Sequence, residues 1–188
     1  MVIIRFIVID GLDGSGKDTQ ARMLQEYLEK KGEKVVLRAH PSRDSRLGRI
    51  SRKALTKKGS LMRIIATLFF GFDVVRSVHL YCKGGGTVIF VRYIMASAYL
   101  PKPIIKPVYW LVSRWLPTSD EMFFLDVAPA EALRRVKARG EQEEMFETLP
   151  KMEKVRGRAL MIADRWAVID GNGPVEEVFS KIVCRLRR

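Results

Sequence analysis

The sequence is poor in the residues that build metal centres and disulfide frameworks. It holds two cysteines, Cys82 and Cys184, and two histidines, His40 and His79. Neither pair has the spacing of a metal site or of a disulfide framework, and the histidines lack the spacing of a catalytic pair. Unpaired cysteines at this frequency favour a reducing compartment, so we expect a cytoplasmic protein.

Long uninterrupted apolar runs are absent as well. The most apolar region, residues 61–82, contains Arg63, Asp73 and Arg76, whereas a membrane span requires roughly 18 or more uninterrupted apolar residues. The apolar opening segment 2–10 carries a charge and leads directly into a glycine-rich loop, which fits a strand better than a signal peptide. We therefore expect no membrane span, and we interpret 61–82 as a long helix buried in the core.

Acidic residues are in deficit: 34 Lys and Arg stand against 21 Asp and Glu, and the formal net charge is +13. This charge predicts an anionic partner, such as a nucleotide, a nucleic acid or an acidic membrane surface. Because the basic residues are scattered along the chain, nucleic-acid binding stays possible but is not favoured, and we expect no membrane partner. The length of 188 residues fits one domain over 1–188.

The hydrophobic pattern alternates between short strand-like and longer helix-like segments. Strands are predicted at 2–10, 34–40, 86–91, 121–127 and 166–170. Helices are predicted at 17–31, 46–57, 60–82, 93–115 with breaks at Pro101, Pro103 and Pro107, 129–138, 147–164 and 174–187. Five strands that alternate with helices indicate an α/β fold, a three-layer α/β/α sandwich with a five-stranded parallel sheet. Ligands bind such sheets beyond the carboxyl ends of the strands.

The stretch GLDGSGKDTQ, residues 11–20, lies at such an end. Gly11, four residues and then Gly16-Lys17 match the phosphate-binding loop that gives the P-loop NTPase fold its name. Its glycines let backbone N–H groups surround phosphate oxygens, and Lys17 reaches the outer phosphates. We therefore predict ATP binding. The predicted contacts to its phosphates are Gly11, Leu12, Asp13, Gly14, Ser15, Gly16, Lys17, Asp18 and Thr19.

The guanine-reading pattern Asn-Lys-x-Asp does not occur, which argues against a GTPase switch. From FIVIDGLDGSGKDTQ to AVIDGNGPVEEV, through VRY at 91–93 and RGEQEEMFE at 139–147, the sequence resembles the thymidylate kinase family. The resemblance implies transfer of the ATP γ-phosphate to dTMP with Mg²⁺ as cofactor. It also implies a homodimer formed through the helices beside the third strand.

Four positions match residues that contact phosphates or the nucleoside in that family. The resemblance implies that Asp13 orients the acceptor phosphate and that Arg43 holds it. It implies that Arg92 binds phosphates and that Tyr99 lines the nucleoside pocket.

Three further positions complete the candidate site. Phe72 and Arg76, one helical turn apart, correspond to the aromatic and the arginine that stack on thymine and bond its O4. Arg139 corresponds to the cation of a lid at about 139–148. The candidate catalytic residues are thus Lys17, Arg92, Arg139 and Asp13, and the candidate acceptor-binding residues are Arg43, Phe72, Arg76, Arg92 and Tyr99.

The sequence departs from the family pattern at the expected metal site. Asp18 stands where the family has Ser or Thr, and Val91 stands where it has Asp. Our hypothesis is that Asp18 replaces both groups as the Mg²⁺ ligand, since Mg²⁺ accepts carboxylate oxygens. Without a metal between them, a carboxylate roughly 4 Å from phosphate oxygens costs about 4 kcal/mol at an effective dielectric of 20. Alternatively, Asp18 caps its own helix.

Other departures keep two alternatives open. Leu100 replaces a family glutamine, and RAHP at 38–41 lacks an expected glutamate. The first alternative is a kinase of the same fold that acts on another nucleoside monophosphate or on a nucleoside. The second is a catalytically impaired nucleotide-binding or nucleic-acid-associated protein, and a steep salt dependence of nucleic-acid affinity would favour it.

Overall fold

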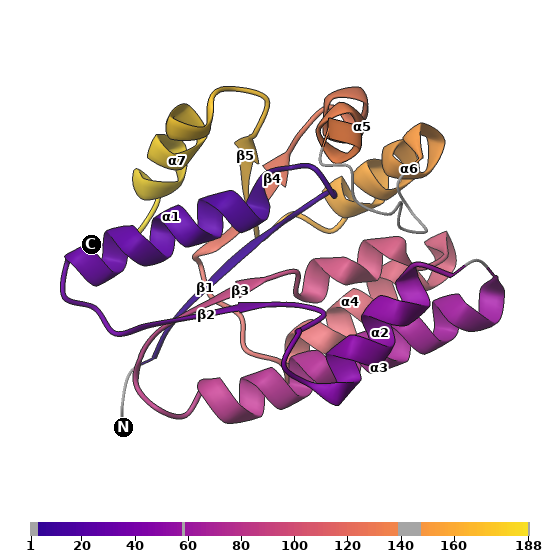
Figure 1. The fold of residues 1–188 in the computed structure, drawn as a ribbon, viewed down its shortest axis with the longest axis horizontal. Helices are drawn as coiled ribbons and strands as arrows, with labels where there is room; N and C mark the ends of the chain where they lie inside the picture. Colours follow the sequence, from indigo (N-terminus) through magenta and orange to yellow (C-terminus); the bar gives the residue numbers. More distant parts are fainter. Residues whose placement is uncertain (1–3, 58, 139–147, 188) are drawn as a thin grey trace.

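A parallel five-stranded sheet forms the centre of the molecule (Figure 1). The computed structural model describes residues 4–57, 59–138 and 148–187. The strands are β1 (Ile4–Gly11), β2 (Val35–Ala39), β3 (Gly86–Val91), β4 (Met122–Asp126) and β5 (Ala167–Asp170), in the order β2-β3-β1-β4-β5. Every pairing is parallel. The predicted strands and the predicted α/β/α fold are confirmed.

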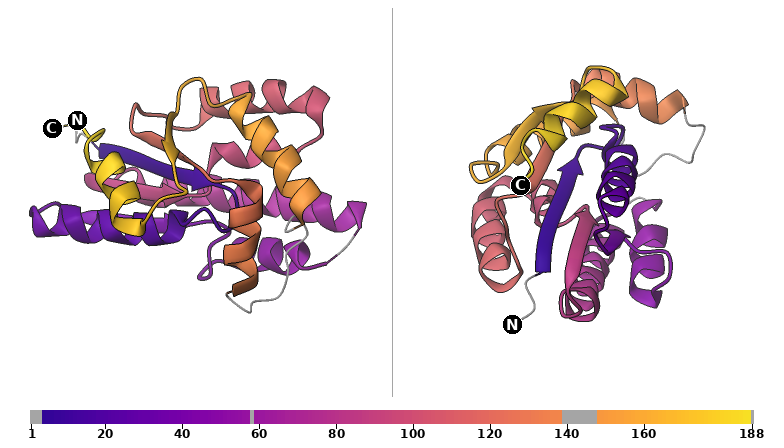
Figure 2. Two further views of the ribbon diagram at one scale, coloured as in Figure 1. Left: turned by 90° about the horizontal axis from the view of Figure 1, so that it is seen from above. Right: turned by 90° about the vertical axis from the view of Figure 1, so that its left-hand side faces the viewer.

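Helices cover both faces of this sheet. They are α1 (Lys17–Lys30), α2 (Arg46–Leu55), α3 (Ser60–Tyr81), the 3-10 helix η1 (Ile94–Tyr99), α4 (Lys102–Trp115), α5 (Pro129–Ala138), α6 (Leu149–Leu160) and α7 (Val175–Val183). Successive side chains of a strand point to opposite faces. In β1, Ile7 and Ile9 therefore pack with α1 and α7, whereas Phe6 and Val8 pack with α3, η1, α4 and α6. Figure 2 shows the sheet between these two layers.

In the helical segment predicted at 93–115, the break at Pro101 is confirmed and the breaks at Pro103 and Pro107 are wrong. The chain forms η1, leaves helical geometry at Leu100 and Pro101, and begins α4 at Lys102. Pro103 does not break α4, because in the first turn its missing N–H has no intrahelical partner to lose. Pro107 lies inside α4 on its exposed side, so the backbone carbonyl that its missing N–H would have bonded is open to water.

The expectation that residues 61–82 lie buried in the core is also wrong. Within α3, the window Ile64–Tyr81 is long and apolar enough to cross a membrane, yet 22% of it is buried. One face, with Ala66, Asp73 and Val74, packs into the protein. The opposite face exposes an apolar stripe at helical spacing: Leu61, Ile64, Leu68, Phe72 and Val75. The helix therefore has one core face and one apolar outer face.

Candidate active site

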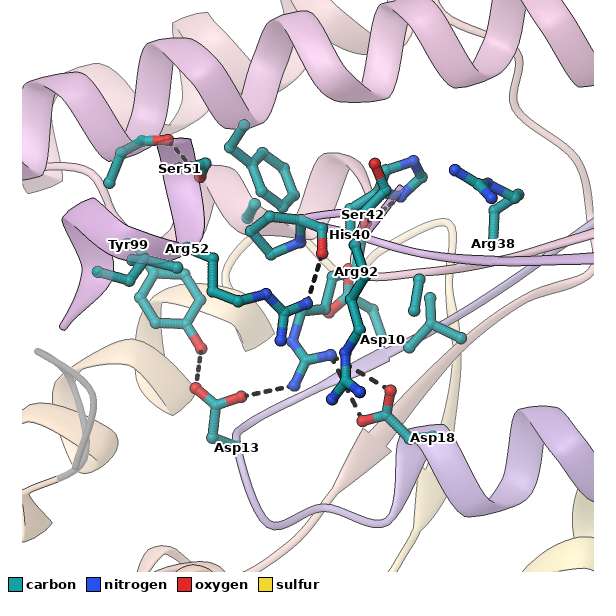
Figure 3. Close-up of a pocket in the computed structure, with 18 of the residues that line it drawn as sticks. Asp10, Asp13, Asp18, Arg38, His40, Ser42, Ser51, Arg52, Arg92 and Tyr99 are labelled. Atoms are coloured by element: carbon teal, nitrogen blue, oxygen red, sulfur yellow. Dashed lines mark hydrogen bonds and ion pairs between the residues drawn. The ribbon is translucent and has the colours of Figure 1, made fainter. Parts of the chain in front are cut away.

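A cleft of about 600 Å³ opens at the carboxyl ends of β1, β2 and β3 (Figure 3). Its floor is the glycine loop after β1 together with the end of β3. Its walls come from the segment after β2, from α2, from one face of α3 and from η1. The position agrees with the rule that ligands bind parallel sheets beyond the carboxyl ends of the strands.

Two glycines of the loop have geometry that a side chain would not tolerate. Gly14 has a φ of +81°, and a Cβ atom there would lie 2.2 Å from the carbonyl oxygen of Ala132. Gly16 has a φ of +85° and caps the N-terminus of α1 without a side chain. Both positions require glycine because left-handed backbone is costly for other residues. The loop can therefore wind closely around an anion at the start of α1.

Lys17 is the buried cation of this loop. Its Nζ donates hydrogen bonds to the carbonyl oxygen of Leu12 at 2.8 Å and to Oδ1 of Asp13 at 3.2 Å. Its side chain is 3% exposed, so its charge acts in a poorly solvated environment.

Arg92 brings a second cation from the end of β3. It has a φ of +59°, the one non-glycine residue with positive φ in the described part of the chain. Nη2 donates to Asp13 Oδ1 at 3.2 Å, and Nη1 lies 3.4 Å from both oxygens of Asp18. Figure 3 shows the guanidinium of Arg92 between the two carboxylates. The left-handed backbone turns this side chain from the sheet edge into the cleft.

The charges in this cluster depend on one another. Burial alone would raise the pKa of Asp13, but Lys17 and Arg92 outweigh burial and hold that pKa far below its usual range. The same balance, with Arg92 as the larger cation effect, lowers the pKa of Asp18. Burial would lower the pKa of Arg92, but Asp13 and Asp18 raise it above its ordinary value. Asp13, Asp18 and Arg92 are therefore ionised at neutral pH.

Asp10 holds the two loops of the site together. Its side chain accepts the backbone N–H of Gly11 at 2.9 Å and that of Tyr93 at 2.8 Å. Burial raises the pKa of Asp10. Because both oxygens accept backbone donors, Asp10 fixes the end of β3 against the glycine loop, and with it the position of Arg92.

Other predicted loop residues differ in exposure. Leu12 and Ser15 are buried, and the Oγ of Ser15 has no hydrogen-bond partner within the described residues. Asp18 lines the cleft, and its side chain is 44% exposed. Thr19 is exposed on α1 and is not among the residues lining the cleft. One residue step rotates a helical side chain by about 100°, which separates it from Asp18.

The segment after β2 is anchored to α3 through Asp73. This buried carboxylate accepts the backbone N–H of Ser42 at 2.6 Å and hydrogen bonds from the hydroxyls of Ser42 and Ser45. Ser45 Oγ also accepts the N–H of Gly48 and so caps α2. Arg43, between these anchors, is exposed and lines the cleft. A fixed backbone therefore presents the guanidinium of Arg43 to an anionic ligand.

The structure does not bring Phe72 and Arg76 to the cleft. Phe72 is 58% exposed on the outer stripe of α3, and Arg76 is not among the cleft-lining residues. The aromatic that lines the cleft from α3 is Phe70, beside Ala66. Two residues along a helix correspond to about 200° of rotation, so Phe70 and Phe72 face opposite ways. The assignment of Phe72 and Arg76 to the base pocket is corrected on this ground.

Tyr99 lines the cleft, and its hydroxyl donates to Asp13 Oδ2 over a long 3.5 Å. Arg139 and the lid predicted at about 139–148 fall on residues 139–147, outside the described residues.

Sequence reasoning missed several residues of the cleft. Arg38, His40, Ser51, Arg52 and Phe70 all line it. Arg52 donates to the carbonyl oxygen of Pro41 at 2.7 Å, and Arg38 pairs with Asp44 at 2.6 Å. Asp73 shares a helix face with Phe70 at i+3, but only its bond to Ser42 shows that this face meets the cleft.

Comparisons with known proteins agree with one another. A family model described as thymidylate kinase matches residues 9–182. The chain is 32% identical to a probable thymidylate kinase from Pyrococcus abyssi, with 97% of this chain and 95% of that protein covered. It is 32% identical to a thymidylate kinase from Leptospira borgpetersenii, with 97% and 93% covered. A solved structure of thymidylate kinase from Candida albicans matches with a TM-score of 0.76 at 24% identity, covering 97% of this chain and 91% of that one.

Proposed function

Because the chain belongs to the thymidylate kinase family, and so is an ATP-dependent nucleoside monophosphate kinase, we propose that it moves the γ-phosphate of ATP to dTMP. One observation carries the proposal: Lys17 and Arg92 converge on Asp13, and Asp13, Arg92 and Arg43 line the same cleft. Two cations at the donor loop and one at the acceptor segment match the charges of a donor phosphate and an acceptor phosphate.

The phosphates of ATP lie in the loop from Gly11 to Thr19. There Lys17 contacts the outer phosphates, and the backbone N–H groups at the start of α1 contact the inner ones. Arg92 contacts the phosphoryl group in transfer while it stays next to Asp18, because a guanidinium has several N–H donors that can serve both groups. Phosphoryl transfer depends mainly on such positioning and charge neutralisation, so a strong base is not required.

The acceptor occupies the part of the cleft between α2, α3 and η1. Arg43 binds the phosphate of the acceptor, and Asp13 and Tyr99 orient the acceptor. The ring of Phe70 stacks on its base. Phe70 takes the stacking role that the sequence pattern gave to Phe72. Residues 139–148 act as the lid over ATP, with Arg139 as its cation.

The residues of the cleft also fit Mg²⁺. Asp18 is ionised, partly exposed and held by Arg92 at a distance longer than an ordinary charged hydrogen bond. Mg²⁺ binds through one or two carboxylates together with waters and substrate phosphates, so Asp18 supplies the protein ligand. Within the described residues no group of three or more His, Cys, Asp or Glu side chains gathers as a metal site. When bound, Mg²⁺ neutralises charge on the phosphate oxygens.

A coupled assay of ADP release tests the proposed acceptor. The assay uses ATP and Mg²⁺ with dTMP, dUMP, UMP, CMP, AMP or thymidine, on the wild type and on Lys17→Ala. Turnover with dTMP that is lost in Lys17→Ala supports the proposal. Turnover only with another acceptor identifies a same-fold kinase of different specificity. ATP binding without turnover of any acceptor identifies a catalytically impaired nucleotide-binding protein.

The outer stripe of α3 suits a two-fold homodimer. Its residues Leu61, Ile64, Leu68, Phe72 and Val75 are apolar and exposed, and an isologous interface needs one such self-complementary patch. Phe72→Asp should convert the dimer to a monomer in sedimentation velocity. Val175→Asp, an exposed apolar residue of α7, is the matched control and should stay dimeric. A wild-type monomer at micromolar concentration would contradict the assignment.

The state of the cysteines supports a cytoplasmic protein. Cys82 is partly buried and Cys184 is exposed, and both are free. Free thiols are typical of a reducing compartment. Fractionation of cells that express a tagged protein would test this location.

A further inference from the structure

Helix α4 presents an apolar and aromatic surface that the proposed kinase site does not use. Its inner face packs on the core through Ile105, Tyr109 and Val112. Its outer face exposes Ile104, Trp110, Leu111 and Trp115, with 43%, 64%, 52% and 79% of each residue accessible. We name these four residues the α4 ridge. In both views of Figure 2, α4 lies at the outer edge of the molecule. Two exposed tryptophans on one helix are unusual for a surface that contacts only solvent.

Basic residues flank the α4 ridge without acidic neighbours in the chain. Lys102, Lys106 and Arg114 are exposed on the same helix, and the guanidinium of Arg114 lies 5.8 Å from the ring centre of Trp110. The sequence contains no Asp or Glu between Asp73 and Asp120. Helix α4 is therefore amphipathic on its solvent side. It carries the α4 ridge together with the basic residues Lys102, Lys106 and Arg114, which we call the cationic border.

A groove next to α4 extends this cationic border. Lys102 lines it from α4, and Lys154, Arg158 and Met161 line it from α6 and its C-terminal end, together with one acid, Glu153. Nη1 of Arg158 donates to the carbonyl oxygen of Leu100, which fixes α6 against the start of α4. Three cations against one carboxylate leave a net positive groove at the N-terminal end of α4.

Against the expectation from the sequence of no membrane partner, we propose that the α4 ridge and this groove dock on an anionic lipid surface, so that the protein lies on a membrane without crossing it. Tryptophan and short aliphatic side chains enter the headgroup boundary, and lysine and arginine pair with anionic headgroups, which is the pattern of interfacial helices. A second copy of this chain fits less well, because a two-fold contact between α4 helices would set the cations of one copy against those of the other, and residues 102–115 contain no acid to pair with them. A nucleic acid makes no use of Ile104 and Leu111.

Vesicle co-sedimentation tests the proposal with the full chain. The vesicles are phosphatidylcholine with or without phosphatidylglycerol, at several salt concentrations. We expect binding only with phosphatidylglycerol, weaker at high salt. Trp110→Ser combined with Trp115→Ser should lower the partition coefficient roughly tenfold or more. Lys102→Glu combined with Lys106→Glu should lower it similarly.

A matched charge control separates this surface from the overall net charge. Lys30→Glu combined with Lys34→Glu makes the same charge change at exposed positions at the far end of α1 and after it. It should retain vesicle binding, and all variants should keep the kinase turnover of the wild type, which reports correct folding. Equal loss in the control, or binding to phosphatidylcholine alone, would overturn the proposal.

Tryptophan fluorescence locates the contact. Trp166 is 6% exposed and donates to the hydroxyl of Tyr109 at 2.8 Å, so Trp110 and Trp115 are the tryptophans open to solvent. A blue shift with anionic vesicles that disappears in the double serine variant supports docking. A shift with a single-stranded oligonucleotide but not with vesicles would assign the surface to nucleic acid. A change of sedimentation in that variant without lipid would assign it to self-association.

Discussion

The guanidinium of Arg92 lies 3.4 Å from both carboxylate oxygens of Asp18, across 74 positions of sequence. A carboxylate beside phosphate oxygens should weaken ATP binding unless a cation neutralises it. Arg92 supplies part of that neutralisation, so the cost of about 4 kcal/mol expected for an uncompensated charge is reduced. The unusual acid after Lys17 is thus compatible with a phosphate-binding loop.

The role of Asp18 is testable through the metal requirement. If Asp18 is the protein ligand of Mg²⁺, Asp18→Asn should raise the Mg²⁺ concentration for half-maximal activity roughly tenfold, because an amide oxygen binds this ion more weakly than a carboxylate. The measurement is a Mg²⁺ titration of dTMP-dependent ADP release. Asp44→Asn, which removes another acid of the cleft, is the control and should keep the wild-type titration.

An unchanged Mg²⁺ titration in Asp18→Asn would reject the ligand role. A changed KM for ATP in the same variant would then assign Asp18 to Arg92 alone, as the group that positions its guanidinium.

Substitution of Lys17 should cause the largest loss of activity. Lys17→Ala should lower kcat by roughly 10²–10³-fold, because it removes a preorganised charge next to the transferring phosphoryl group. It also removes one of the two cations that hold Asp13 ionised. Lys30→Ala, at an exposed lysine of the same helix, should keep the wild-type kcat. A Lys17→Ala enzyme with normal turnover and normal thermal unfolding would exclude this loop as the donor site.

The strands and the phosphate loop were predictable because their signals are local. The run Ile7, Val8 and Ile9 is apolar at every position, which is typical of a strand covered on both faces. The glycines of the loop pattern also indicate its backbone geometry, because Gly14 and Gly16 adopt left-handed backbone that other residues rarely adopt. Neither inference required knowledge of a distant contact.

The orientation of α3 was not predictable in the same way. The segment is apolar around most of its circumference, so periodicity does not separate the core face from the outer stripe. Phe70 and Phe72 are equally good candidates for the cleft until Asp73 is known to bond Ser42. The left-handed backbone of Arg92 and its long-range pairing with Asp18 likewise depend on tertiary structure.

Phe70 and Phe72 form a matched pair for testing the corrected base pocket. Phe70→Ala should raise the KM for dTMP roughly tenfold or more, since stacking of a base on an aromatic ring contributes about 1–3 kcal/mol. Phe72→Ala should leave that KM unchanged, because its side chain lies on the outer stripe of α3. The measurement is the dTMP dependence of initial rate at saturating ATP. The reverse pattern would restore the original assignment of Phe72.

The buried His40 should make the free energy of unfolding depend on pH. Its ring is 1% exposed, with Nδ1 3.1 Å from the carbonyl oxygen of Arg92, and burial, partly opposed by Asp73, lowers its pKa to about 4. A histidine with a folded pKa below its unfolded value of about 6.5 contributes stability that is complete above pH 6.5 and is lost as pH falls toward 4. The shift corresponds to at most about 3 kcal/mol. Urea unfolding at a series of pH values should show this decline, and His40→Gln should flatten it. An unchanged slope in His40→Gln would show that His40 is not its source.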